Sequence, residues 1–136
     1  MVAAAMTAFA ADPPPDDAQA VQGSWKPETA ELAGQAFPVA VLKTISLKLT
    51  NATYEVYVGN QPDRGTYTLD AASQPRGMTI TGTNGPNQGK TFPAIYELKG
   101  DTLRICYDLS GAKRPAEFKT SAGTQLYLVT YNRKRE

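Results

Sequence analysis

Gln22-Gly23-Ser24-Trp25-Lys26 is the stretch that decides the predicted fold, because it holds the only tryptophan of the chain. Tryptophan buries a large surface and needs a partner for its indole N–H, so in a chain this short it belongs in the core. Gly23, two residues earlier, allows another backbone or side chain to approach closely. Two interpretations follow: Trp25 is an ordinary core residue, or it closes one end of a β-barrel.

Length and charge restrict the classes of function that the chain can have. Its 136 residues suffice for one domain with a single core. The 14 basic and 13 acidic residues nearly balance and are scattered, so no nucleic-acid partner is expected. One cysteine, Cys106, and no histidine argue against a disulfide within the chain, a zinc site and a Ser/His or Cys/His nucleophile pair. We therefore expect no enzymatic activity, no cofactor and no metal site.

Residues 1–19 differ in composition from the rest of the chain. Residues 1–11 are small and apolar, and Ala8-Phe9-Ala10 matches an A-x-A cleavage site, as at the end of a secretory signal peptide. The alternative is an Ala-rich terminus without a targeting role. Residues 12–17, rich in proline and aspartate, predict an exposed linker. We predict an exported protein, periplasmic or extracellular, whose residues 1–19 contribute nothing to the core of a domain over residues 20–136.

The alternation of apolar and polar residues predicts an all-β domain. In residues 44–50 every second side chain is apolar, as in a half-buried strand, and residues 91–107 form the clearest hairpin, turning at Gly100-Asp101. Residues 59–63 carry turn chemistry. Further strands are expected at residues 25–33, 54–58, 64–70, 78–83 and 125–133, and residues 37–43 predict a short lid. Eight strands joined by tight turns favour a closed antiparallel up-and-down β-barrel, with an open sandwich as the alternative.

Residues 20–136 resemble an uncharacterised lipocalin-like domain family described from planctomycetes, which opens on a Gly-x-Trp motif. The stretches that carry the resemblance are Gln22-Gly23-Ser24-Trp25, Gly65-Thr66-Tyr67-Thr68-Leu69-Asp70, Gly89-Lys90-Thr91, residues 95–106, Arg114-Pro115 with Glu117-Phe118, and Arg133. The resemblance implies a calycin-type barrel and no established activity or ligand. The chain departs from the family at Ser24, where threonine is more usual.

The same resemblance implies a cation across the tryptophan ring at the closed end of the barrel, and Arg133 is the candidate. The first and last strands of a closed barrel are antiparallel neighbours, so Trp25 and Arg133 should meet at one rim. A guanidinium there combines cation–π attraction with hydrogen bonds to carbonyls that the barrel end leaves free. Gly23, Trp25 and Arg133 are the predicted structural signature.

Four tyrosines are the candidate ligand-binding residues of the barrel interior: Tyr54, Tyr67, Tyr96 and Tyr107. An apolar cavity with a few phenolic hydroxyls suits a small hydrophobic or amphipathic ligand, whereas the alternative is that these rings fill the interior. The predicted function is an exported, monomeric binding module with such a ligand and without integral membrane association. The other hypothesis is a ligand-free barrel scaffold that mediates protein–protein contacts.

Four further features of the sequence are candidates for chemistry or for a structural role. Cys106 beside Arg104 is either a reactive thiol or an inert, partly buried side chain, and the sequence favours the second. Glu97 and Arg104 lie on opposite arms of one hairpin and predict an ion pair. Residues 114–118 either cover the barrel mouth or form an ordinary loop. Residues 84–89 lack the context of a phosphate-binding loop, so no nucleotide site is expected.

Overall fold

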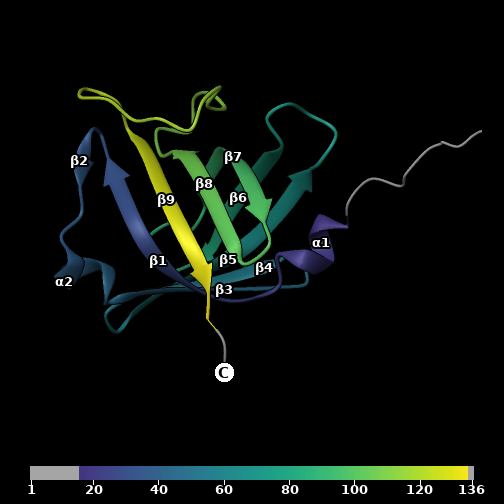
Figure 1. Ribbon diagram of the computed structural model, residues 1–136, viewed down its shortest axis with the longest axis horizontal. Helices are drawn as coiled ribbons and strands as arrows, with labels where there is room; N and C mark the ends of the chain where they lie inside the picture. Colours follow the sequence, from purple (N-terminus) through teal and green to yellow (C-terminus); the bar gives the residue numbers. More distant parts are fainter. Residues whose placement is uncertain (1–15, 135–136) are drawn as a thin grey trace, which may run out of the picture.

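The computed structural model describes residues 16–134, which form a closed antiparallel β-barrel (Figure 1). Its eight strands are β1 (Gly23–Leu32), β3 (Ile45–Thr50), β4 (Thr53–Val58), β5 (Gln61–Asp70), β6 (Gly77–Asn84), β7 (Thr91–Lys99), β8 (Thr102–Asp108) and β9 (Leu126–Arg133). Each pairs with its neighbour in sequence, and β9 returns to β1. The predicted eight-stranded up-and-down barrel is confirmed.

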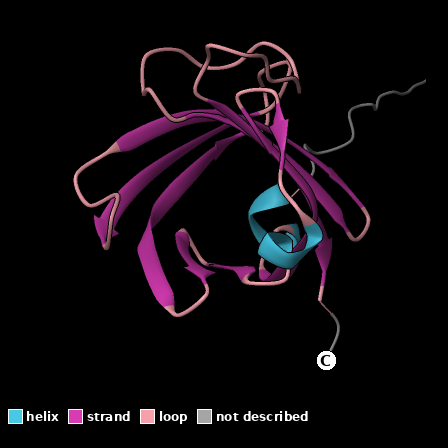
Figure 2. Ribbon diagram, turned by 90° about the vertical axis from the view of Figure 1, so that its left-hand side faces the viewer, coloured by secondary structure: helices cyan, strands magenta, loops and turns pink. Residues whose placement is uncertain are grey.

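Three short elements accompany the barrel. The two-residue strand β2 (Gln35–Ala36) pairs with the end of β1. The helices α1 (Asp17–Ala20) and α2 (Val39–Leu42) lie on opposite sides in Figure 1, and Figure 2 shows the strands curving round a shared interior with α2 in front. Within the described residues, neither helix is long and apolar enough to cross a membrane.

Closure between the first and last strands is continuous. The β1–β9 register runs from Trp25 opposite Arg133 to Leu32 opposite Tyr127. On its other side, Trp25 pairs with Leu47 of β3. The first strand therefore has a partner on both sides at the tryptophan, and no open edge separates it from the last strand.

Trp25 closes one end of the barrel and is fully buried. Its indole Nε1 donates a hydrogen bond to the Val21 carbonyl at 2.9 Å. The Arg133 guanidinium carbon lies 4.3 Å from the centre of the ring. Arg133 also donates to the carbonyls of Gln22 and Ala20, each at 2.7 Å. The predicted cation–π contact and the predicted hydrogen bonds to free carbonyls are both present.

Gly23 leaves the room that this arrangement needs. A Cβ at residue 23 would lie 2.9 Å from Nη1 of Arg133, and the φ angle of 136° is one that side-chain-bearing residues rarely adopt. The third guanidinium nitrogen, Nε, donates to Asp101 at 3.0 Å. The structure thus brings the three signature residues Gly23, Trp25 and Arg133 together at one rim.

The folded domain begins before residue 20. Asp17 is only 5% exposed, and its Oδ2 accepts hydrogen bonds from the Tyr96 hydroxyl at 2.6 Å and from Arg76 at 3.0 Å. The prediction that residues 1–19 contribute nothing to the core is therefore wrong for Asp17, because partners distant in sequence bury a carboxylate whose local composition predicts a linker. The predicted signal-peptide remnant falls in residues 1–15, which lie outside the described residues.

Strand β5 begins at Gln61 rather than at Arg64. Gly59-Asn60 alone forms the turn, since Val58 already pairs with Gln61 and the φ angle of Gly59 is 65°. A Gly-Asn pair between strands is typical of a two-residue hairpin turn, which is the signal that the predicted longer turn overlooked. As a result Asp63 lies within a strand, opposite Val56.

Replacing Arg133 by alanine should lower the free energy of unfolding by about 2 kcal/mol, because the cation–π contact and three hydrogen bonds are lost together. Urea denaturation measures the change. Lys134→Ala, at the exposed neighbouring position, is the matched control and should cost less than about 0.5 kcal/mol. Equal effects of the two substitutions would contradict the role given to Arg133.

Asp17→Ala should lower the free energy of unfolding by about 2–3 kcal/mol, since the buried Tyr96 hydroxyl then loses its acceptor. Asp16→Ala, which removes only an exposed side-chain cap on α1, should cost about 1 kcal/mol or less. Thermal or urea unfolding of both variants measures the two losses in free energy of unfolding. A smaller loss for Asp17→Ala than for Asp16→Ala would show that the buried carboxylate does not stabilise the domain.

Candidate functional site

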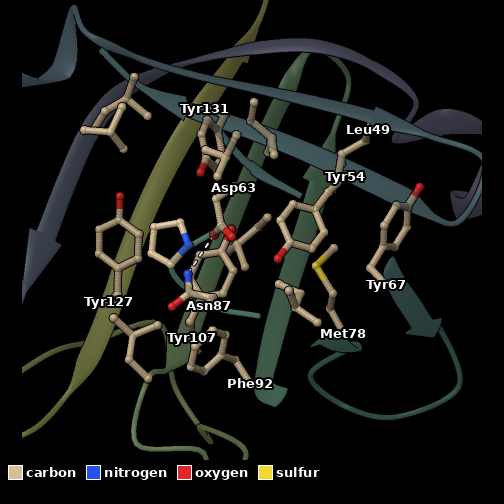
Figure 3. Close-up of a pocket in the computed structure, with 18 of the residues that line it drawn as sticks. Leu49, Tyr54, Asp63, Tyr67, Met78, Asn87, Phe92, Tyr107, Tyr127 and Tyr131 are labelled. Carbon is tan, nitrogen blue, oxygen red and sulfur yellow. Dashed lines mark hydrogen bonds between the residues drawn. The ribbon is translucent and has the colours of Figure 1, made fainter. Parts of the chain in front are cut away.

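A cavity of about 310 Å³ lies inside the barrel (Figure 3). Its lining extends from Leu47, the β3 partner of Trp25, to Val58, Pro86 and Leu109, which lie at or beside the turns of the opposite rim. Aliphatic side chains of β3, β4 and β6 form much of the wall. Five tyrosines complete it: Tyr54 of β4, Tyr67 of β5, Tyr107 of β8, and Tyr127 and Tyr131 of β9.

The structure brings three of the four predicted tyrosines together in this cavity. Tyr54, Tyr67 and Tyr107 all line it. Tyr96 is buried in the core as well, but its hydroxyl is bonded to Asp17 and the ring is not part of the cavity wall. Tyr96 therefore belongs to the structural network around Asp17 rather than to the candidate site.

Two tyrosines of the last strand belong to the site and were missed. Tyr127 and Tyr131 of β9 both line the cavity, and Val129 between them is also buried. The period-two alternation of these three residues is the signal that would have found them. The Tyr127 ring stacks on Tyr107 with centroids 5.5 Å apart, and it contacts Phe37 at 5.7 Å.

Burial keeps the tyrosine hydroxyls protonated. It raises the pKa of Tyr54 to about 12, with the nearby Asp63 charge as the second cause, and it raises the pKa of Tyr127 to about 12. Burial also raises the pKa values of Tyr107 and Tyr131. The cavity thus presents neutral phenols that can donate or accept a hydrogen bond.

One carboxylate lies among the apolar and aromatic side chains of the cavity wall. Asp63 is the only charged side chain of the described residues that line the cavity. Its Oδ2 accepts a hydrogen bond from Nδ2 of Asn87 at 2.7 Å, drawn as a dashed line in Figure 3. Its Oδ1 is buried and accepts no hydrogen bond from the described part of the chain. Sequence reasoning missed Asp63 because it assigned residues 59–63 to a turn.

The loop after β6 holds Asn87 in place. Gly82 donates its N–H to the Lys90 carbonyl and accepts from Gly89, both at 2.9 Å, so the loop folds back onto the strand. A Cβ at residue 82 would lie 2.1 Å from the Asn87 carbonyl oxygen, which explains the need for glycine at this close approach. Asn87 is therefore presented to Asp63 by a hydrogen-bonded turn rather than by a loose segment.

Cys106, the Glu97–Arg104 pair and the segment at Arg114 lie on the outer face of the barrel. Cys106 is fully buried beneath the segment after β8, and burial raises the pKa of its thiol, which favours the inert interpretation. Glu97 and Arg104 form the predicted cross-strand pair at 3.0 Å. Arg114 donates to the carbonyls of Met78 and Ala94 on the outer face of the barrel, so this segment does not cover the mouth.

No protein-family model, no curated protein and no solved structure matches this chain. The assignment of a function therefore depends on the geometry of the barrel and of its cavity.

The raised tyrosine pKa values predict a loss of stability in alkali. Tyrosine ionises near pH 10 in the unfolded chain, whereas Tyr54 and Tyr127 ionise near 12 when folded. Between these values the folded state binds more protons than the unfolded state, so the free energy of unfolding should fall as pH rises from about 10 through about 12. Urea midpoints across this range measure the fall, which Tyr54→Phe should reduce. A midpoint that rises with pH would be incompatible with these shifts.

Proposed function

We propose that this protein is a binding module that holds a small hydrophobic or amphipathic molecule inside its barrel. The cavity of about 310 Å³ is the observation that carries the proposal. This volume lies at the lower end of the range of ligand pockets, of about 300–1,000 Å³. Its wall combines an apolar surface with a few polar groups, the composition that fixes an amphipathic ligand in one orientation.

The cavity favours this function over a ligand-free scaffold. A barrel that serves only as a scaffold would fill its interior with side chains, because packed protein cores leave few voids larger than a water molecule. Here the rings of Tyr54, Tyr107 and Tyr127 surround the space instead of filling it. The alternative scaffold function would need a packed interior.

The proposal is one of binding without catalysis, by an exported monomer. Acid–base chemistry on a bound molecule generally uses a pair of groups with different pKa values, whereas Asp63 is the single carboxylate of the cavity wall in the described residues. The apolar residues 1–11 support export, and the Gly-x-Trp opening supports the resemblance to the lipocalin-like family.

Binding should be detectable in two ways. Native mass spectrometry of the protein purified from its own host should show a co-purifying small molecule. After that molecule has been extracted, an apolar fluorescent probe should bind in its place. Val56→Trp fills part of the cavity and should weaken probe binding about tenfold or more.

Tyr57→Trp is the matched control, because Tyr57 adjoins Val56 on the same strand, is not part of the cavity wall, and contacts Arg64. It should leave probe binding within about twofold of the unmodified protein. Equal binding by both variants, or a protein to which no apolar probe binds, would overturn the proposed function.

A further inference from the structure

We infer that the ligand of the barrel carries a cationic group, an amine or quaternary ammonium, that pairs with the Asp63 carboxylate. This inference rests on the proposed binding function and names the chemical class of the ligand. It begins from the position of the carboxylate, which β5 places opposite Val56 and in the wall of the cavity.

The first step is that the protein leaves the Asp63 charge under-compensated. An ionised carboxylate has about four acceptor sites, and the described residues supply a single hydrogen bond, from Asn87 to Oδ2. Its other oxygen is buried without a donor. A carboxylate in apolar surroundings is costly unless it is paired, so this site gains from a partner that brings positive charge.

The second step is that neighbouring cations of the protein are engaged elsewhere. Arg64, the next residue along β5, is directed to Glu55 with its Nε 2.6 Å from the carboxylate, and it also donates to Tyr57 at 3.2 Å. Neither Arg64 nor any other Lys or Arg of the described residues lines the cavity. Positive charge at Asp63 must therefore come from the ligand.

The third step is that aromatic rings surround the same position. Figure 3 shows Asp63 directed into the space among the rings of Tyr54, Tyr107 and Tyr131. Tyr54 and Asp63 both line this cavity, and after burial the Asp63 charge is the second cause of the raised pKa of the Tyr54 hydroxyl. Tyrosine faces attract organic cations, and more strongly where water is excluded. A carboxylate bordered by such rings suits an ammonium group better than a neutral donor.

The remaining wall selects the rest of the molecule. Beyond Asp63 and Asn87 the cavity is lined mainly by aliphatic and aromatic side chains. An inorganic cation would find one carboxylate and few other oxygen ligands there, whereas calcium and magnesium prefer six or more. The geometry therefore points to an amphipathic organic cation, with its charged head at Asp63 and an apolar tail against the walls.

Three probes of equal chain length test the inference by isothermal titration calorimetry at neutral pH: octylamine, octanol and octanoate. Octylamine should bind about tenfold tighter than octanol, because a charge-assisted hydrogen bond replaces a neutral one. Octanoate should bind most weakly, since its charge is repelled. This ranking is measured on the unmodified protein and does not depend on the folding of any variant.

Asp63→Asn keeps the shape of the side chain and removes its charge. It should weaken octylamine binding about tenfold and leave octanol within about twofold, which abolishes the ranking. Glu55→Gln is the matched control, because it removes the same charge from a residue of β4 that pairs with Arg64 and is not in the cavity wall. It should preserve the ranking.

The outcomes separate this inference from the proposed function. If octanol binds and octylamine binds no tighter, or if octanoate binds best, the cationic class is wrong while the binding function stands. If Asp63→Asn and Glu55→Gln weaken octylamine equally, net charge rather than Asp63 is responsible, and the inference fails. If none of the three probes binds, the inference fails together with the proposed binding of small amphipathic molecules.

Discussion

Closure of the barrel between β1 and β9 is the constraint on which the rest of the structure depends. It brings Trp25 and Arg133, which lie at opposite ends of the domain sequence, onto adjacent strands. The guanidinium then covers the indole and bonds to carbonyls of the chain that leads into β1. Because a closed barrel has no free edge, each strand is hydrogen-bonded to two neighbours. The inward-facing side chains then determine whether the interior is packed or contains a cavity.

Buried polar groups have more hydrogen-bond partners at the closed end of the barrel than in the cavity. At the closed end, every polar nitrogen of the Arg133 guanidinium has an acceptor, and the buried Asp17 carboxylate receives bonds from Tyr96 and Arg76. In the cavity, Asp63 receives one bond. The polar groups of the closed end thus have partners within the protein, whereas the Asp63 carboxylate in the cavity wall has one.

Asp63 is the single carboxylate among the described residues of the cavity wall, and it receives one hydrogen bond, from Asn87. Charged groups with few partners inside the protein are found preferentially at functional sites, where a ligand can supply further interactions. Tyr107 and Tyr127 stack on one another and keep their hydroxyls protonated, so they offer faces and donors without adding charge. Among the described residues that line the cavity, Asp63 is therefore the single charged group.

Local pattern and composition determined the barrel and its hairpin turn at Gly100-Asp101, because strand alternation and turn residues follow from the order of residues. The contact of Arg133 with Trp25 was expected from the resemblance to a Gly-x-Trp family together with the antiparallel relation of the first and last strands. Strand alternation also predicted three of the five tyrosines that line the cavity, Tyr54, Tyr67 and Tyr107. Only the tertiary structure decided that Asp17 is buried, that Asp63 lies in the cavity wall, and that Asn87 meets it. These contacts join residues that are far apart in the chain, so no local sequence pattern predicts them. In addition, a shift of one residue in the position of a turn moves each strand side chain to the other face of the sheet.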